Sequence, residues 1–234
     1  KAGGTAVSNT DGSITSQVSA NVDAGLSIVS WAGNGTSGAT IGHSLGVTPD
    51  VVIVKNRTTS GTNWPVFHSS QGTGSNGYLD ITNSWASGST WGSTQTFNST
   101  VFSVGSQNYV NNSGDNMIAY CFHNVEGYSK FGTYEGNGNN DGTFVYTGFR
   151  PAFLLVKSVD STSDWLLVDD KRIGYNPENE YIEVNNANAE GTVNMFDLVS
   201  NGFKNRDRTA DPNVAETYLY IAFASQPFKF ANAR

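Results

Sequence analysis

One apolar stretch occurs twice in the chain, and this repetition constrains the fold more than any other feature of the sequence. The segment 46–55, GVTPDVVIVK, returns at 148–157 as GFRPAFLLVK, with a proline, an apolar run and a terminal lysine in step. The flanking residues return in the same order, GNG at 33–35 and again at 136–138. The two copies begin about a hundred residues apart. This spacing predicts two copies of one domain-sized unit, because the repeats of solenoids and propellers are much shorter.

Both halves of the chain alternate short apolar runs with clusters of Gly, Asn and Ser, and no helix of ordinary length is evident. The runs 51–54 and 153–156 are expected to be central strands. Pro49 and Pro151 come just before them, where a residue that cannot donate to a sheet hydrogen bond is tolerated. The sequence therefore predicts an all-β chain of two tandem, internally duplicated antiparallel β-sandwich units, of the jelly-roll or lectin-like kind.

The two predicted units span residues 26–127 and 128–234, and they meet at VEGYSKFG without a flexible linker. Residues 1–25 are rich in Ser, Thr, Asn and Gly, and no segment of that length precedes the second unit. We expect them to form a linker, an incomplete edge or the end of a preceding repeat.

Composition argues against several classes of partner. The net charge of −7 at pH 7 opposes nucleic-acid binding, which depends on Lys and Arg. No apolar run approaches the roughly 20 residues that span a bilayer, so no membrane insertion is expected. The first unit is nearly uncharged outside Lys55 and Arg57, which makes it the better place for a neutral ligand. Cys121, the only cysteine, lies in the alternating run MIAYCFH and is expected to be buried and unreactive.

Residues that could perform catalysis are scattered along the chain. His43, His68 and His123 fall in different predicted strands, and no G-x-S-x-G motif accompanies them. Asp169 and Asp170 end the run DWLLVDD, but neighbouring strand residues point to opposite faces, whereas glycoside hydrolysis needs two carboxylates in one cleft. We interpret these acids as solvated loop carboxylates close to basic neighbours, together with Glu178, Glu180 and Glu183.

The loop 137–142, NGNNDG, partly matches a calcium-binding loop, but Gly148 stands where the bidentate glutamate should be. A hairpin turn explains it better, because Asn and Gly tolerate positive φ. The sequence therefore predicts no catalytic activity, no cofactor and no metal site.

A pair of tryptophans marks the strongest candidate for a binding surface. Trp85 and Trp91 lie in a segment with few aliphatic residues, and the corresponding interval 185–194 has no tryptophan. Indole faces stack on the apolar faces of sugars, while amides and hydroxyls meet sugar hydroxyls. We predict a glycan site formed by these two tryptophans with the hydrogen-bonding partners Asn83, Gln95 and Asn98. The alternative is that both indoles close one end of the sandwich. Trp64 and Trp165 recur at corresponding places and are expected in the core.

Long strings in both halves are similar to a known family. The strings are WAGNGTSGATIGHSLGVTPDVVIVKNR, MIAYCFHNVEGYSKFGTYEGNG, GTFVYTGFRPAFLLVK and YLYIAFASQPFKFANAR. They resemble a repeat domain of tailed-phage proteins, abundant in marine phages, that are regarded as tail-fibre or other virion components. This resemblance also implies that residues 1–25 follow a preceding repeat of a longer protein.

The resemblance implies a virion protein that is assembled in the host cytoplasm and attaches to host-surface polysaccharide. Its implied partners are other virion proteins and further copies of itself, for example in a trimer. Two alternatives stay open: an enzyme that depolymerises surface polysaccharide, as a glycoside hydrolase or a lyase, and a capsid decoration protein.

Overall fold

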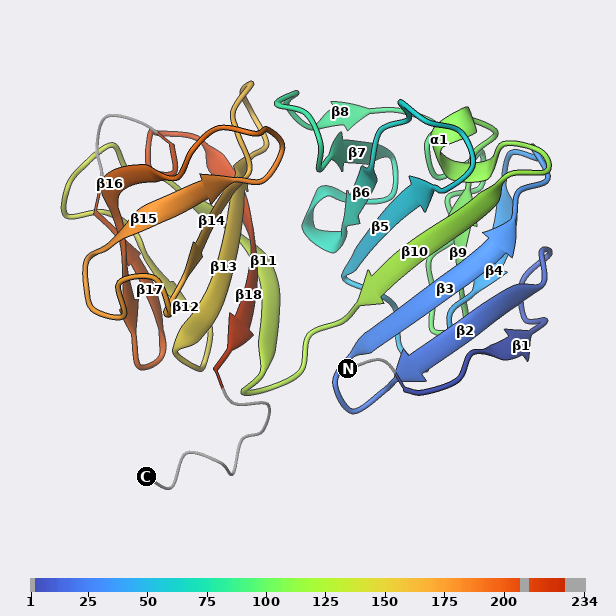
Figure 1. Ribbon diagram of the computed structural model, residues 1–234, viewed down its shortest axis with the longest axis horizontal. Coiled ribbons are helices and arrows are strands. Elements are labelled where there is room, and N and C mark those ends of the chain that lie inside the picture. The colour runs from blue at the N-terminus through green and yellow to red at the C-terminus, as the bar shows by residue number, and fades with distance from the viewer. Residues whose placement is uncertain (1–2, 207–210, 226–234) are drawn as a thin grey trace. The chain divides into compact units, whose positions relative to one another are not determined.

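The computed structural model describes residues 3–206 and 211–225, and they form an all-β protein with antiparallel sheets (Figure 1). Within the described residues, the contacts define two compact units. Unit 1 comprises the chain up to Leu79 together with Ala86–His123, and unit 2 comprises Asp80–Trp85 and the chain from Asn124 onward. None of the described helices is long and apolar enough to cross a membrane.

Unit 1 is a β-sandwich. Its main sheet has the strand order β1 (Val7–Asn9), β2 (Ser16–Asn21), β3 (Leu26–Ala32), β10 (Asn116–Phe122), β5 (Val51–Asn56), β6 (Pro65–His68), β7 (Ser75–Tyr78) and β8 (Ala86–Ser87). A second sheet pairs β4 (Ala39–Gly42) with β9 (Val101–Val104). Unit 1 also contains two short helical turns, η1 (Ser69–Gln71) and α1 (Asn108–Asn111). The buried core joins residues of both sheets, including Trp31, Ile41 and Phe102.

The central strand β10 shows how the sequence pattern places side chains in unit 1. Met117, Ala119 and Cys121 are fully buried in the core, as expected from alternation along a strand. The residues between them point to the opposite face of the sheet and are only partly buried. Tyr120 is one of these, and on that face it lies between Ile28 of β3 and Ile53 of β5.

Residues 3–25 form the edge of a sheet and not a linker. β1 and β2 extend the main sheet of unit 1, and Val18 is buried where β2 pairs with Val29 of β3. Ile14 forms an isolated bridge with Ile41 of the second sheet. This segment forms the edge of a sheet, which is one of the roles expected from the sequence. Its apolar residues are too few and too widely spaced to indicate a strand by periodicity, and Val18 is buried only because β2 pairs with the edge of β3.

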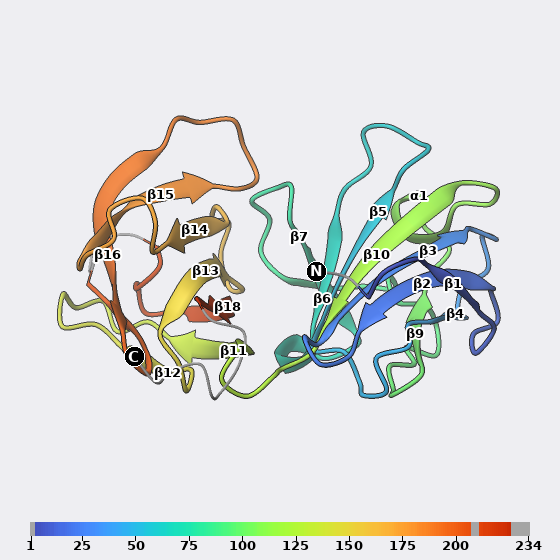
Figure 2. The same ribbon diagram turned by 60° about the horizontal axis from the view of Figure 1, so that its bottom comes forward.

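Unit 2 consists of one antiparallel sheet that curls into a nearly closed, barrel-like arrangement (Figures 1 and 2). The strand order is β11 (Ser129–Glu135), β18 (Thr217–Ala224), β13 (Pro151–Ser158), β14 (Leu166–Asp169), β15 (Glu178–Glu183), β16 (Gly191–Val199), β17 (Gly202–Asn205) and β12 (Phe144–Tyr146). Aromatic rings fill its core: the ring of Tyr134 stacks on Tyr218 at 5.2 Å and meets Phe203 edge-on at 5.6 Å. The expected core position of Trp165 is confirmed, because its side chain is fully buried.

The boundary between the units is not a single point in the sequence. Residues 80–85 belong to unit 2 by their contacts, although the sequence predicted residues 26–127 as one continuous unit. The Trp85 N–H donates to the Val159 carbonyl at 3.0 Å, and the Ser163 N–H donates to the Thr82 carbonyl at 2.9 Å. β7 ends at Tyr78, and the chain then leaves the sheet of unit 1.

Candidate functional site

Trp91 is a core residue of unit 1, which corrects the prediction that it presents a face to a glycan. Its side chain has no exposed surface, and its indole Nε1–H donates to the Ser75 carbonyl at 2.9 Å. Phe67 and Phe97 meet the indole edge-on at 6.0 and 5.7 Å. A buried indole that is enclosed by other rings cannot stack on a ligand. Trp91 therefore packs inside the sandwich, as the alternative interpretation expected.

The remaining predicted residues are divided between the two units. Asn83 and Trp85 belong to unit 2, whereas Gln95 and Asn98 belong to unit 1. The Asn98 Oδ1 accepts two backbone N–H groups and a hydroxyl of its own turn at 2.9 Å, which is a structural role. Gln95 has a positive φ of 47° and its Oε1 accepts from the Thr73 hydroxyl at 3.3 Å.

His43 and His68 accept hydrogen bonds from the backbone. His43 is fully buried; its Nε2 lies 3.1 Å from the Asn98 carbonyl, and its Nδ1 accepts the Leu45 N–H at 3.2 Å. Burial lowers the pKa of His43, so the ring is neutral and both nitrogens are used. His68 is also buried, and its Nδ1 accepts from the backbone of Ser70 as the cap of η1.

The acidic residues of unit 2 are engaged by neighbouring residues. The Asp169 carboxylate pairs with the Arg172 guanidinium at 2.9 Å, and that guanidinium also reaches Glu190 at 2.9 Å. The Glu183 carboxylate accepts from the amides of Asn186 and Asn188 at 2.7 Å. The expectation of loop carboxylates is wrong for these two residues, because Asp169 ends β14 and Glu183 ends β15, but both have the basic or amide partners that the sequence suggested.

The loop 137–142 is built as a turn. The Asn137 Oδ1 accepts the Asn139 N–H at 3.0 Å, the Asn139 Oδ1 accepts the Asp141 N–H at 2.9 Å, and Asp141 forms an ion pair with Lys204. These bonds use the side-chain oxygens that a cation would need. Within the described ranges, no group of three or more His, Cys, Asp or Glu side chains is placed to hold a metal ion.

A hollow of about 470 Å³ lies on unit 1 at the end of β5, and we call it the unit 1 pocket. It is lined by one strand end, the loop that follows it and the outer face of β10: Lys55, Asn56, Arg57, Thr58, Thr59, Ser60, Trp64, Ile118 and Tyr120. Trp64 is partly buried and thus differs from Trp165, although both were expected in the core. The pocket thus combines aromatic surface, hydroxyl groups, an amide and two cations.

The Lys55 ammonium lies over the Trp64 ring, with the Nζ atom 5.3 Å from the ring centroid. This distance is within the range of a cation–π interaction. The same Nζ donates to the Thr62 carbonyl. Both interactions follow from alternation along β5, because Val54 and Asn56 are buried and Lys55 points to the other face.

A buried amide holds the wall of the unit 1 pocket. The Asn56 Oδ1 accepts the backbone N–H groups of Thr58 and Thr59 at 2.9 Å, and its Nδ2 donates to the Asp115 carboxylate at 2.8 Å. The Thr59 hydroxyl also donates to Asp115, at 2.7 Å. Hydrogen bonds from Asn56, Thr59 and Asn112 lower the pKa of Asp115, so this group remains a carboxylate whose acceptors are directed at the loop.

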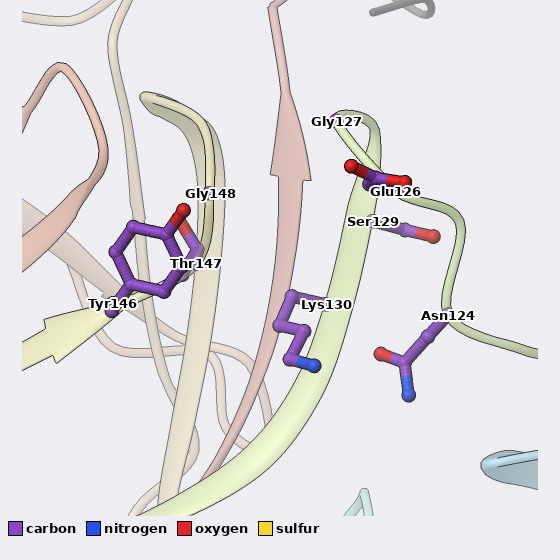
Figure 3. Close-up of a pocket in the computed structure, with 8 residues that line it drawn as sticks. All are labelled: Asn124, Glu126, Gly127, Ser129, Lys130, Tyr146, Thr147 and Gly148. Atoms are coloured by element: carbon purple, nitrogen blue, oxygen red, sulfur yellow. The ribbon is translucent and has the colours of Figure 1, made fainter.

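Unit 2 has a hollow of similar size, about 460 Å³, which we call the unit 2 pocket (Figure 3). It is lined by Asn124, Glu126, Gly127, Ser129, Lys130, Tyr146, Thr147 and Gly148. Tyr146 forms one side and is 66% exposed, and Figure 3 shows Lys130 between it and the segment that carries Glu126. The Thr147 hydroxyl is already used, because it donates to the Phe149 carbonyl at 2.6 Å. This pocket is lined by one acid, one cation and a single aromatic ring, so it offers a ligand less aromatic surface and less positive charge than the unit 1 pocket does.

Sequence reasoning missed the unit 1 pocket because its two rings come from segments that are far apart in the chain. Trp64 follows β5, whereas Tyr120 lies on β10, and only the sheet brings them to one face. One signal was present: Lys55 and Arg57 stand almost alone as cations in the first half of the chain.

The chain was compared with known proteins. No curated protein and no solved structure matches it. The model of a family that is described as Domain of unknown function (DUF7483) matches residues 1–227, which is nearly the whole length. The chain therefore belongs to the DUF7483 family.

Proposed function

We propose that this chain is a virion protein of a tailed phage, a distal tail-fibre module that attaches to a glycan of the host surface through the unit 1 pocket. It is assembled in the host cytoplasm and works in the virion next to other virion proteins. The proposal joins the resemblance to tailed-phage proteins with the chemistry of one pocket, and it moves the glycan site from Trp85 and Trp91 to Trp64.

The observation that carries the proposal is the partly exposed Trp64 indole in a pocket rimmed by hydroxyl groups. A volume of about 470 Å³ is within the range of small-ligand sites and can take a sugar ring. Trp64 and Tyr120 offer apolar surface for the faces of such a ring. The Ser60 hydroxyl and the O–H of Thr58, whose oxygen accepts the Asn116 N–H, offer hydrogen bonds. Sugars need this combination, because one face of the ring is apolar and its edge is polar.

Such a site binds one sugar weakly. Burying one indole face contributes a few kcal/mol, which corresponds to dissociation constants near millimolar. Useful attachment then depends on several copies that act together, because tethered sites multiply weak affinities through their effective concentration. A homo-oligomer, such as a trimer, supplies those copies.

We also propose that units 1 and 2 are tandem duplicates of one sandwich-type unit. Within unit 1 the sheet contains the order β3-β10-β5-β6-β7, and β4 pairs with β9; within unit 2 the order is β11-β18-β13-β14-β15, and β12 pairs with β17. These orders match strand by strand along the chain, which supports a common origin. β1 and β2 are then an addition to the edge of the first copy.

Matching side-chain bonds support the duplication further. Asn111 and Asn34 exchange amide bonds in unit 1 (2.9 and 3.1 Å), and Asn213 and Asn137 do so in unit 2 (3.1 and 3.2 Å). In the same way, the residue that ends the repeated strand donates to a carboxylate just before the central strand. The pairs are Asn56 with Asp115 at 2.8 Å and Ser158 with Glu216 at 2.7 Å.

The attachment proposal is tested with the full chain on a glycan array and on host cells. Trp64→Ala is expected to abolish binding and to lower the thermal midpoint by only about 5 °C, because its indole is only partly buried. Trp85→Ala is the matched control, since it removes an indole from unit 2 and should bind like the wild type. Wild-type binding by Trp64→Ala would refute the proposed site.

A reducing-end assay on the bound polysaccharide separates attachment from the depolymerase alternative. We expect no new reducing ends after prolonged incubation. Cleavage that is lost on changing Asp169, Asp170 and Glu183 to their amides would establish the enzyme instead.

A further inference from the structure

We infer that the sugar bound in the unit 1 pocket carries a carboxylate, as a uronic or sialic acid does, and that Lys55 and Arg57 bind this group. The inference rests on the proposed function and adds to it the chemical class of the ligand. It replaces the expectation of a neutral ligand with an acidic one.

The first argument is the distribution of cations. Lys55 and Arg57 are the only Lys or Arg side chains among the described residues of unit 1, and both line this pocket. Neither forms an ion pair with a carboxylate of the described chain. In unit 2 most of the described cations are paired with carboxylates: Arg150, Lys171, Arg172, Lys204 and Arg206. The unit 1 pocket thus gathers positive charge that the protein itself does not neutralise.

The second argument is the direction of the available donors. The Lys55 Nζ uses one N–H on the Thr62 carbonyl and lies over the Trp64 ring, which leaves further N–H groups beside the aromatic wall. Arg57 is exposed, and its backbone N–H, not its side chain, bonds the Asn116 carbonyl at 2.8 Å. A guanidinium offers paired N–H groups that match the two oxygens of a carboxylate.

The acid that holds the loop of the unit 1 pocket is engaged by other partners. Asp115 accepts from Asn56, Thr59 and Asn112 at 2.7–2.8 Å, so its acceptor oxygen is directed at the loop. The loop therefore keeps its shape while both cations remain available to a ligand.

The ligand is a sugar with an isolated carboxylate rather than a densely charged polymer. Trp64, Ile118 and Tyr120 require an apolar surface on the ligand, which phosphate lacks and a sugar ring has. The net charge of −7 repels a polyanion such as nucleic acid, but two local cations are sufficient for one carboxylate.

The test uses the full chain and three methyl glycosides, of glucuronate, galacturonate and N-acetylneuraminate. Each is compared with its carboxyl-reduced counterpart, which keeps the ring and removes the charge, and with acetate, which keeps the charge and removes the ring. Binding is followed by NMR through the indole N–H signal of Trp64, which is assigned from its loss in Trp64→Phe.

We expect at least one acidic glycoside to bind at least tenfold more tightly than its reduced counterpart and than acetate. Lys55→Gln and Arg57→Gln should each weaken it roughly tenfold, as expected for loss of a charge-assisted hydrogen bond. Lys130→Gln is the matched control, because it removes an exposed cation from the unit 2 pocket and should change nothing. Arg57 is exposed, so its substitution reports on binding and not on folding.

Equal binding of acidic and reduced glycosides, both lost in Trp64→Ala, would overturn this inference and leave the glycan site standing. Acetate that binds as well as the glycosides would also overturn it, because the site would then recognise a carboxylate without a sugar. Failure of all three acidic glycosides and of every sugar on the glycan array would overturn the proposed function together with the inference.

Discussion

Lys55 in unit 1 and Lys157 in unit 2 end the same repeated sequence run, yet their surroundings are opposite. Lys55 is partly buried, donates to one carbonyl and borders an open pocket. Lys157 is 2% exposed, and its three N–H groups are all used on the Ser158 carbonyl, the Ser161 carbonyl and the Ser163 hydroxyl at 2.7–3.2 Å. The comparison teaches that a repeated residue keeps its place in the sheet without keeping its role.

The difference comes from the loop after the strand. In unit 2 the segment 80–85 is hydrogen-bonded to this loop at Val159 and Ser163, and two loop carbonyls and the Ser163 hydroxyl accept from the amine. In unit 1 the loop is held by Asn56 and leaves Lys55 and Trp64 at the surface of a hollow. The same strand therefore supports a sealed amine in one unit and an open pocket in the other.

The largest expected effect separates Trp165 from Trp64. Trp165→Ala should lower the free energy of unfolding of unit 2 by about 3 to 5 kcal/mol, because it empties a fully buried site. Trp64→Ala should cost about 1 kcal/mol in unit 1, since its indole is only partly buried. Denaturant series that are followed by hydrogen exchange in peptides of each unit measure the two values. Equal losses at both positions would remove the distinction between a core indole and a pocket indole.

The next effect tests what the two units share. Asn111→Ala and Asn213→Ala should each cost about 2 kcal/mol, because both amides are fully buried and each substitution leaves buried partners without their hydrogen bonds. In each unit the lost partners are the asparagine of the GNG turn and one further carbonyl. The expected equality is checked with the same unfolding series. Costs that differ by more than twofold would argue against the two units as duplicates.

A third effect, of similar size, is a pH dependence that belongs to unit 2. Burial lowers the pKa of Lys157 to about 8, against its usual 10.5. Between these values the unfolded chain binds more protons than the folded one, so the unfolding free energy rises as the pH increases through this window. The rise should be about 2 kcal/mol up to pH 9.5, which is less than the full pKa difference implies because that range stops short of the usual pKa of lysine.

Lys157→Met should abolish this rise, as measured by unfolding of unit 2 from pH 7.5 to 9.5, below the usual pKa of tyrosine. Lys55→Met is the control and should leave the slope of unit 2 unchanged, because it does not alter the sealed amine. A slope that survives in Lys157→Met would assign the pH dependence to another group.

Much of the strand pattern could be read from the sequence. The two runs expected to be central strands, 51–54 and 153–156, lie inside β5 and β13, because apolar alternation and flanking turn residues mark strands locally. The buried, unreactive Cys121 follows from the same alternation, and burial raises the pKa of its thiol. The turn at 137–142 was equally readable, since Asn and Gly form it with their own side chains and backbone.

Other features depended on partners that no local pattern reveals. β1 and β2 exist because the edge of β3 accepts them, and β17 pairs with β16 although it has little alternation of its own. Trp91 stands in a polar segment, but Phe67 and Phe97 enclose it from other parts of the chain. The nearly closed sheet of unit 2 likewise depends on pairings between strands that are distant in sequence.

The sequence by itself determined the all-β class, most strand positions and the repeat that ends in Lys55 and Lys157. These features depend on short-range alternation and turn chemistry, which the order of residues contains. Only the tertiary structure decided which tryptophans are buried and which lysine is sealed. Burial is a property of what packs against a residue, and for these side chains the packing partners come from distant segments of the chain.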